Sequence, residues 1–303
     1  SVQEQFAALF PGEGRVHVVR SPGRVNLIGE HTDYNEGFVF PMAIEPEVRL
    51  AYRGRDDCRM RLASTHFPGQ VVEFALDQPI ERGEPAWANY LKGVAAELKA
   101  AGIPLAGADV LVANTLPVGG GLSSSAALEV GMARAMLHLG GLEMDLSRLA
   151  LLCQKAEHEF ALVPCGIMDQ TIVAGGRAGH AMLLDCRDLS KQFIPIDPAE
   201  LRVVIVNTMV RHELSGTEYA ARRKQCEAGV RFLAAGNANV KALRDVTLEQ
   251  VEAARGRLDE VVWKRCRHVV TENQRAADAA RLLVRQEYEE VGQLMVASHA
   301  SLR

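Results

Sequence analysis

The sequence has 303 residues, enough for about two domains, and its 48% hydrophobic and 24% charged residues are ordinary for a soluble globular protein. The net charge of −4 argues against a protein that grips nucleic acid without regard to sequence, because such binding needs a basic surface. Glycine, proline or charge interrupts the long apolar stretches, which argues against a membrane span. The six cysteines form no CxxC pair and no zinc-site spacing, so we expect reduced thiols and a cytoplasmic protein.

The first part of the chain alternates strand and helix patterns. Runs of apolar or alternating residues predict strands over residues 16–20, 39–53, 58–63, 71–76, 108–113, 181–185 and 201–207. Apolar residues at helical spacing predict helices over residues 87–101, 124–139 and 146–161. We therefore expect both sheet and helix in this part of the chain.

The second part of the chain is mainly helical in pattern. Helices are predicted over residues 217–234, 247–255, 260–285 and 288–301. The pattern changes between residues 175 and 215, which indicates a domain boundary. We place an N-terminal domain at residues 1–178 and a C-terminal domain at residues 179–303.

Residues 23–35 concentrate more polar chemistry than a structural turn needs. The stretch holds the cation Arg24, the carboxylates Glu30 and Asp33, the imidazole His31 and two amides. Such groups are costly to desolvate unless something polar fills the space between them. A molecule built of hydroxyl groups would fill it, so the stretch points to a sugar.

A glycine-rich loop over residues 117–127, here called the glycine-serine loop, leads into a predicted helix. Its three consecutive glycines allow close approach of the backbone to a ligand, and a helix N-terminus offers unpaired N–H groups with partial positive charge. We therefore expect phosphate on this loop, with serine hydroxyls able to donate or to reach magnesium. The Walker pattern is absent, because no lysine follows the glycines. The alternative is a flexible turn capped by serine.

Two carboxylates further along the chain are candidates for chemistry. Glu157 lies beside the apolar stripe of the predicted helix 146–161, and the alternative for it is a solvated helix charge. Asp169 lies in a mostly apolar turn over residues 164–170, where burial would favour its neutral form unless a cation offsets it. Arg24 is the candidate cation. An ionised Asp169 could accept or orient the proton of a substrate hydroxyl, and the alternative is a carboxylate that caps a turn.

Taken together, these motifs resemble the galactokinase family of the GHMP kinase superfamily. The resemblance covers nearly the whole chain, at residues 23–44, 117–127, 164–170, 211–212, 215–226, 267–270 and 298–299. The first of these motifs is specific to galactokinases and close relatives, whereas the glycine-serine loop alone indicates only the superfamily. The resemblance implies an α+β, two-domain GHMP kinase fold, with a ribosomal-protein-S5-like N-terminal domain that binds nucleotide and sugar and a ferredoxin-like C-terminal GHMP domain.

The resemblance also implies a role for each matched position. Asp169 takes the place of the catalytic carboxylate that accepts or orients the proton of the anomeric hydroxyl, and Arg24 that of the arginine that keeps it ionised. The implied sugar-binding residues are Arg24, Glu30, His31, Asp33, Gly166, Asp169 and Tyr219. The implied residues for the ATP phosphates are Gly119, Gly120, Gly121, Leu122, Ser123, Ser124 and Ser125.

Two further pairs of residues follow from the resemblance. Ser125 and Glu157 match the magnesium ligands of the family. Trp87 and Tyr90 match contacts on the adenine side of ATP, and the alternative for both is a core aromatic.

The activity that the resemblance implies is ATP-dependent phosphorylation of the C1 hydroxyl of α-D-galactose, with Mg²⁺ and direct in-line transfer. The expected partners are galactose and ATP, without nucleic acid or membrane, and we expect a monomer. One alternative is a kinase for N-acetylgalactosamine or another sugar, since the sequence does not show which residues crowd the 2-position. The other is a galactose- and ATP-binding regulator without catalysis.

Galactokinases carry a third glycine-rich motif further along the chain than the stretch matched by residues 298–303. The sequence reaches Arg303 without that motif. We expect a longer gene product, because a second domain without the strands around that motif would fold poorly.

Overall fold

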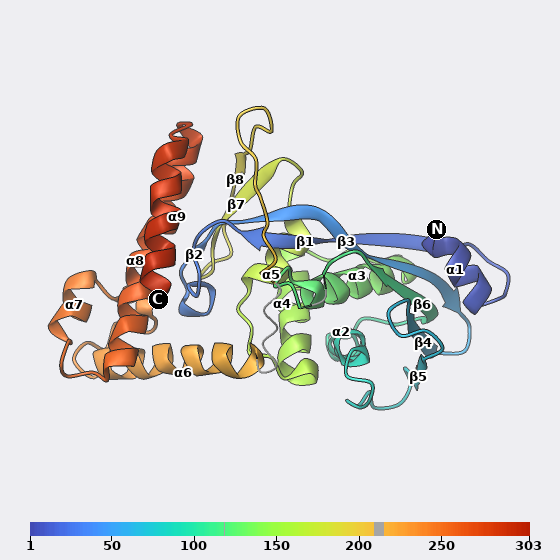
Figure 1. Cartoon of the computed structure of the whole chain (residues 1–303). Coiled ribbons are helices and arrows are strands. Elements are labelled where there is room, and N and C mark those ends of the chain that lie inside the picture. Colours follow the sequence, from blue (N-terminus) through green and yellow to red (C-terminus); the bar gives the residue numbers. More distant parts are fainter. Residues whose placement is uncertain (118, 209–214) are drawn as a thin grey trace. The chain divides into compact units, whose positions relative to one another are not determined.

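The structure, a computed structural model, describes residues 1–117, 119–208 and 215–303 (Figure 1). The chain divides into two compact units. Unit 1 comprises Ser1–Arg24, Ile44–Cys165 and Asp169–Gly175, and unit 2 comprises Val25–Ala43, Gly166–Met168 and Gly176–Arg303. Each unit is therefore assembled from separate stretches of the chain. The domain limits at residues 178 and 179 stay a prediction.

The sheet of unit 1 is built around a strand that is buried on both faces. This strand, β6 (Gly107–Asn114), is buried over its first six residues and pairs antiparallel with β3 (Pro41–Arg55) and parallel with β4 (Arg59–Ser64). On the far side of β4 lies β5 (Val71–Ala75), and β1 (His17–Asn26) pairs with β3. β1 ends where the glycine-serine loop approaches it, which brings Arg24 to that loop.

Helices pack on one another and on this sheet. Unit 1 contains α1 (Val2–Leu9), α2 (Ala88–Ala100), α3 (Ser124–Leu139), α4 (Leu146–Ala156), the π-helical segment η2 (Glu157–Ala161) and α5 (Met168–Gly175), whose first residue belongs to unit 2. A Cβ at Gly131 would lie 2.8 Å from Leu50 Cδ1, so a glycine lets α3 lie close on β3. A Cβ at Gly93 would lie 2.8 Å from Phe160 Cβ, so α2 packs equally closely on η2. These contacts hold α3 against the sheet and α2 against η2.

Unit 2 combines short strands with long helices. Its strands are β2 (Phe38–Val39), β7 (His180–Asp185) and β8 (Lys191–Pro195), and β7 pairs antiparallel with the other two. Its helical elements are η1 (Asp33–Asn35), α6 (Ser215–Ala234), η3 (Leu243–Asp245), α7 (Leu248–Ala253), α8 (Glu260–Val284) and α9 (Tyr288–Leu302).

The long helix α8 carries the core of unit 2. One of its faces packs on β7, β8 and the segment around Phe40, and another packs on α6 and α7 around Trp263. Helix α9 runs beside α8 (Figure 1). A Cβ at Gly229 would lie 2.1 Å from Cys266 Sγ, so only glycine allows α6 to lie this close to α8.

Most predicted elements are confirmed, with three corrections. The predicted strand 201–207 is wrong: this segment has no regular structure, Val204 and Val206 are 80% and 77% exposed, and no strand among the described residues pairs with it. The predicted helix 146–161 changes at Glu157 from α to π, and the predicted turn 164–170 ends in α5. Residues 211 and 212 of the family resemblance lie outside the described residues. No helix in the described part of the chain is long and apolar enough to cross a membrane.

Candidate active site

Arg24 and Asp169 form a charged pair in unit 1. The Arg24 Nε and Nη2 atoms donate to Asp169 Oδ1 and Oδ2 at 2.7 and 2.8 Å, and only 15% and 22% of the two side chains is exposed. A two-point contact of this kind is the strong form of an arginine–carboxylate hydrogen bond. The Ser123 hydroxyl also donates to Asp169 Oδ2, at 2.5 Å. These contacts place a cation against the carboxylate and fix its orientation.

Backbone contacts hold Arg24 against the glycine-serine loop. Its N–H donates to the Leu122 carbonyl at 3.2 Å, and its Nη1 donates to the Gly121 carbonyl at 2.6 Å. Gly23 permits this approach, because a Cβ there would lie 2.4 Å from a leucine methyl carbon and 3.0 Å from the Leu122 carbonyl oxygen. Asp169 lies in the first turn of α5, where the helix dipole favours a carboxylate.

The glycine-serine loop adopts backbone conformations that few side chains tolerate. Gly119 and Gly121 have φ values of +72° and +69°, and a Cβ at either would meet nothing within 4 Å. Their conformation, and not crowding, therefore requires glycine. Ser123 also has a positive φ, 57°, which is costly for a residue with a side chain. Its hydroxyl contacts Asp169 instead of capping α3, which leaves the first N–H groups of α3 to a ligand.

A second group of carboxylates lies in the core of unit 1. Gln170 Nε2 donates to Glu157 Oε2 at 2.7 Å and to Glu129 Oε2 at 3.1 Å, and these three side chains are at most 4% exposed. Burial and the Asp169 charge raise the pKa of Glu157, and burial and the Glu157 charge raise the pKa of Glu129 well above its usual range. Within the described chain, Glu129 Oε1 and Gln170 Oε1 have no hydrogen-bond partner. Buried acceptors without partners are uncommon and indicate a missing donor or ion.

Glu157 lies where α4 changes to the π-helical segment η2, a kind of distortion that is frequent at functional sites. It forms hydrogen bonds with the Ser125 hydroxyl and, at 3.3 Å, with the Cys165 thiol. A hydroxyl and a carboxylate are the oxygen ligands that Mg²⁺ prefers. Among the described residues, no group of three or more His, Cys, Asp or Glu side chains could hold a metal ion. A magnesium ion beside Ser125 and Glu157 would therefore need further ligands from phosphate and water.

Trp87 and Tyr90 lie at the start of α2, and both are half-buried. The Trp87 ring stacks on Phe67, with 6.0 Å between ring centroids and 10° between ring planes. Burial, followed by the Glu157 charge, raises the pKa of Tyr90 to about 12. Neither side chain is a fully buried core aromatic, and Tyr90 lies near the carboxylate group.

In unit 2 a buried carboxylate anchors the loop after β1. Glu272 Oε1 on α8 accepts the N–H groups of Gly29 and Glu30 at 2.9 and 3.1 Å and the Ser298 hydroxyl at 2.6 Å. Burial opposes ionisation of Glu272, but hydrogen bonds from Ser298, Gly29 and Arg275 lower its pKa overall. The Glu30 side chain in turn accepts from Asn26 Nδ2 at 2.9 Å. The loop that carries the predicted sugar-binding residues is therefore held at both its backbone and its side chains.

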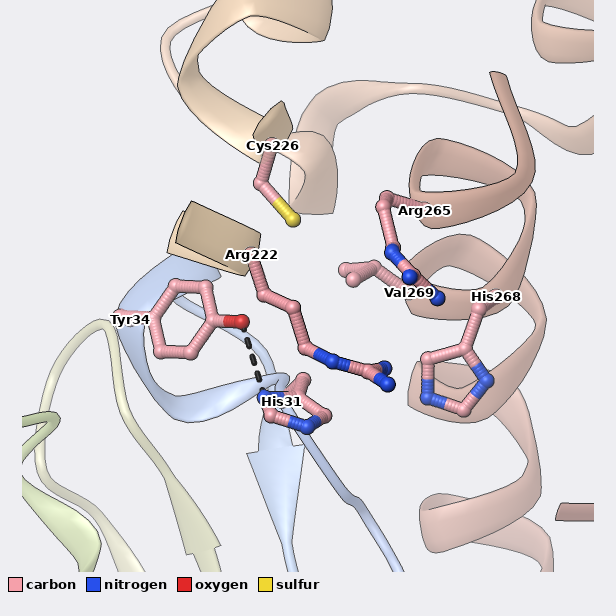
Figure 2. Close-up of a pocket in the computed structure, with 7 residues that line it drawn as sticks. All are labelled: His31, Tyr34, Arg222, Cys226, Arg265, His268 and Val269. Atoms are coloured by element: carbon pink, nitrogen blue, oxygen red, sulfur yellow. Dashed lines mark hydrogen bonds between the residues drawn. The ribbon is translucent and has the colours of Figure 1, made fainter. Parts of the chain in front are cut away.

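His31 lies in a polar and aromatic cluster of unit 2 (Figure 2). Its ring centroid is 5.9 Å from those of Tyr34 and Tyr219, which are 5.3 Å from each other. Burial, followed by the Arg222 charge, lowers the pKa of His31 to about 4, so its imidazole is neutral at physiological pH. The backbone of His31 has a φ of 65°, a strained value that its surroundings maintain.

Gly166 lies against Asp33 in the same unit. A Cβ at Gly166 would lie 1.7 Å from Asp33 Oδ2, so only glycine fits at this position. The N–H of Gly166 donates to the Tyr219 hydroxyl at 3.1 Å. Three predicted sugar-binding residues are therefore in contact within unit 2.

The structure thus gathers the predicted residues into two groups. Those of unit 1 are Arg24, Ser123, Ser125, Glu157 and Asp169 with the glycines of the loop, and those of unit 2 are Glu30, His31, Asp33, Gly166 and Tyr219. Glu157 is not a solvated helix charge, since it is 4% exposed.

Sequence reasoning missed Glu129, Gln170, Tyr34 and Arg222 as members of these groups. A usable signal existed for Glu129, which is the one charged residue in the apolar stretch 126–133 of a predicted helix. No comparable signal marked Tyr34, because a tyrosine in a polar loop is common and does not by itself indicate a function.

Two family models match the chain. They describe the galactokinase galactose-binding signature, at residues 4–54, and the N-terminal domain of GHMP kinases, at residues 89–177. Galactokinases of Chloroflexus aurantiacus and Chloroflexus aggregans are each 47% identical to the chain over 292 residues, which cover 96% of this chain and 74% of either relative.

Solved structures agree with these matches. The galactokinase of Lactococcus lactis complexed with galactose is 35% identical, with a TM-score of 0.94 over 99% of this chain and 78% of that chain. The phosphomevalonate kinase of Streptococcus pneumoniae, 13% identical, has a TM-score of 0.61 over 94% of this chain and 79% of that chain, which shows the fold alone. The expected GHMP kinase fold is confirmed. The chain belongs to the galactokinase family of the GHMP kinase superfamily and is a kinase.

Proposed function

We propose that this kinase transfers the γ-phosphoryl group of ATP to the C1 hydroxyl of α-D-galactose. The galactose-binding signature at residues 4–54 and the likeness to a galactokinase complexed with galactose support this substrate. The observation that carries the chemistry is the Arg24–Asp169 pair, a carboxylate in two-point contact with a cation.

In this proposal Asp169 accepts or orients the proton of the C1 hydroxyl. A carboxylate can do so only when it is ionised and fixed in direction, and Arg24 and Ser123 provide both conditions. Arg24 also offsets negative charge that develops during direct in-line transfer. Because Arg24 bonds the carbonyl of Gly121 as well, the base and the glycine-serine loop have a fixed spacing.

The glycine-serine loop would hold the ATP phosphates. The positive φ values of Gly119 and Gly121 and the first N–H groups of α3 are what an anion-binding turn requires. The full proposed set is Gly119, Gly120, Gly121, Leu122, Ser123, Ser124 and Ser125, with Trp87 and Tyr90 on the adenine side.

Ser125 and Glu157 would hold Mg²⁺. The buried carboxylates Glu129 and Glu157 form no salt bridge within the described chain, and two neighbouring acceptors are orphaned, so the site is short of positive charge. Bound there, Mg²⁺ would neutralise charge on the ATP phosphates. Gln170 fixes the Glu157 carboxylate at 2.7 Å for this task.

Glu30, His31, Asp33, Gly166 and Tyr219 would bind the sugar hydroxyls, together with Arg24 and Asp169. Carboxylates accept hydrogen bonds from hydroxyl groups, and the backbone and tyrosine add further polar groups. The contact between Gly166 and Asp33 and the hydrogen bond from Gly166 to Tyr219 support a shared role.

We also propose a cytoplasmic monomer with domain limits near residues 178 and 179. The six cysteines, all free in the structure, fit a reducing compartment.

The test is an ADP-release assay with galactose, glucose, N-acetylgalactosamine and arabinose, with and without Mg²⁺, followed by phosphorus NMR of the product. The proposal expects turnover on galactose above the other sugars, loss of turnover without Mg²⁺, and phosphate on C1. A preference for N-acetylgalactosamine, or phosphate on another hydroxyl, would overturn the substrate or the position. Binding of galactose and ATP without turnover would point to a regulator.

A further inference from the structure

A hydrogen bond joins the hydroxyl of Tyr34 to the Nδ1 atom of His31. The two atoms are 2.9 Å apart, and Figure 2 shows the hydroxyl directed at the imidazole. Both residues belong to the loop that follows β1, and the Asn35 side chain donates to the His31 carbonyl at 2.9 Å. This local network maintains the strained backbone of His31 and sets the direction of its ring.

The surroundings of the ring keep His31 neutral. Arg222 of α6 and Arg265 and His268 of α8 line one cavity with it, of about 10 Å³, about the volume that one water molecule needs. Arginine is a donor only, so neither guanidinium can accept a hydrogen bond from a protonated imidazole. Glu272 is a carboxylate whose charge would favour a protonated His31, but its own oxygens accept four other donors.

A neutral imidazole carries a proton on only one of its two ring nitrogens. The hydrogen bond with the Tyr34 hydroxyl determines which nitrogen of His31 that is. Besides His31 Nδ1, this hydroxyl has the thiol of Cys226 as a neighbour, a weak donor and a weak acceptor. The imidazole nitrogen is the stronger acceptor, so the hydroxyl proton goes to Nδ1. Burial raises the pKa of Tyr34 above its usual range, so the hydroxyl keeps this proton.

His268, which lines the same cavity, also has a hydroxyl group at Nδ1, and the partner of its Nε2 shows independently where its proton lies. Its Nε2 lies 3.0 Å from the Glu30 carbonyl, which can only accept, so Nε2 carries the proton. Its Nδ1 lies 2.9 Å from the Ser301 hydroxyl, which must then donate. A hydroxyl donating to Nδ1 is therefore the pattern of this part of unit 2.

We infer that Tyr34 is a positioning residue that fixes His31 in the tautomer with the proton on Nε2, so that His31 offers a hydrogen-bond donor to a sugar hydroxyl. The inference rests on the proposed role of His31 in sugar binding. The donor would complement Glu30 and Asp33, which as carboxylates only accept. A donor fixed in direction adds discrimination among sugars, because an analogue without the matching hydroxyl leaves that donor unpaired.

Imidazole ¹⁵N NMR of histidine-labelled protein tests the tautomer directly, without reference to activity. The His31 signals are assigned with His31→Gln, and those of His268 provide the internal reference for the Nε2–H form. The inference expects wild-type His31 to show only Nε2–H between pH 6 and 8, and Tyr34→Phe to show added Nδ1–H. A wild-type His31 with the proton on Nδ1, or an unchanged tautomer in Tyr34→Phe, would overturn it.

Kinetics then separate this inference from the proposed function. Tyr34→Phe should raise KM for galactose about tenfold, leave KM for ATP unchanged and change kcat less than threefold, since one oriented hydrogen bond is lost. Tyr52→Phe is the matched control, because its hydroxyl lies 3.1 Å from Nδ1 of His138 in unit 1, away from the proposed sites. Its KM values should equal those of wild type. If His31→Gln leaves KM for galactose unchanged, the proposed sugar contact is wrong, whereas the NMR result still decides the tautomer.

Discussion

Two carboxylate sites of unit 1 differ in how their charge is balanced, although Asp169 and Gln170 are neighbours in the chain. Asp169 receives two arginine N–H groups and a serine hydroxyl. Glu157 and Glu129 receive neutral donors only, the Gln170 amide at both and the Ser125 hydroxyl and Cys165 thiol at Glu157, and within the described chain neither forms a salt bridge. At Asp169 the protein itself supplies a positive charge, that of Arg24. No cationic side chain in the described part of the chain pairs with Glu157, which agrees with the proposal that Mg²⁺ binds there.

Replacement of Arg24 would leave Asp169, like Glu157, without a cationic partner. Arg24→Met leaves a partly buried carboxylate without its cation, and we expect kcat to fall about a thousandfold. Arg24→Lys keeps the charge but loses the two-point contact, so its kcat should lie between that of Arg24→Met and wild type. ADP release at saturating galactose and ATP measures both, with the exposed Arg59→Met as the control. Equal kcat for Arg24→Met and wild type would show that the pair has no catalytic role.

Replacement of Glu157 would remove the need for a cation at the second site. For Glu157→Gln we expect the Mg²⁺ concentration at half-maximal rate to rise about a hundredfold. In EDTA at neutral pH the variant should unfold at a higher temperature than wild type, because burial and Asp169 raise the pKa of Glu157 and make its ionised form unfavourable. Glu159→Gln, two residues on and 52% exposed, should match wild type in both measurements. An unchanged Mg²⁺ response would remove Glu157 from the metal site.

A smaller change would test the third donor on Asp169. Ser123→Ala should lower kcat about tenfold, the effect of losing one hydrogen bond to a charged acceptor. The binding of ATP should weaken less than kcat falls, because backbone N–H groups and not this hydroxyl are proposed to hold the phosphates. A large rise in KM for ATP with normal kcat would instead assign the Ser123 hydroxyl, and not only its backbone, to the nucleotide.

Glu129→Gln should have the mildest effect on catalysis and a pH-dependent effect on stability. The folded pKa of Glu129 lies above its unfolded value of 4.5, so the folded state holds a proton that the unfolded state releases, and stability falls as pH rises above 4.5. The variant should therefore exceed wild type in free energy of unfolding at pH 7.5, by about 1 kcal/mol or more, and match it near pH 4. Urea denaturation at both pH values measures this, and an advantage of equal size at pH 4 would refute the raised pKa.

The sequence predicted regular elements well where local pattern decides them. Helix α3 has the predicted bounds of residues 124–139, because its apolar face is periodic and Gly140 ends it. The strand predicted over residues 201–207 failed because strand formation depends on a partner, which local alternation does not reveal. The change to π geometry at Glu157 also had no local signal.

The pairing of Arg24 with Asp169 could be anticipated, since an acid in an apolar segment needs a cation. The hydrogen bonds from Gln170 to Glu157 and Glu129 could not be anticipated, because they join side chains that are distant in the sequence. The hydrogen bond between Tyr34 and His31 could not be anticipated either, because it depends on the conformation of a tight turn.

Asp169→Asn is the most direct test of the account, since it keeps the size and shape of the side chain and removes its charge. We predict a fall in kcat of about a thousandfold, with Kd values for galactose and ATP, measured by calorimetry, within threefold of wild type. Asp188→Asn, on the surface, should leave all three values unchanged. A kcat within tenfold of wild type, with binding intact, would contradict the assignment of Asp169 as the base.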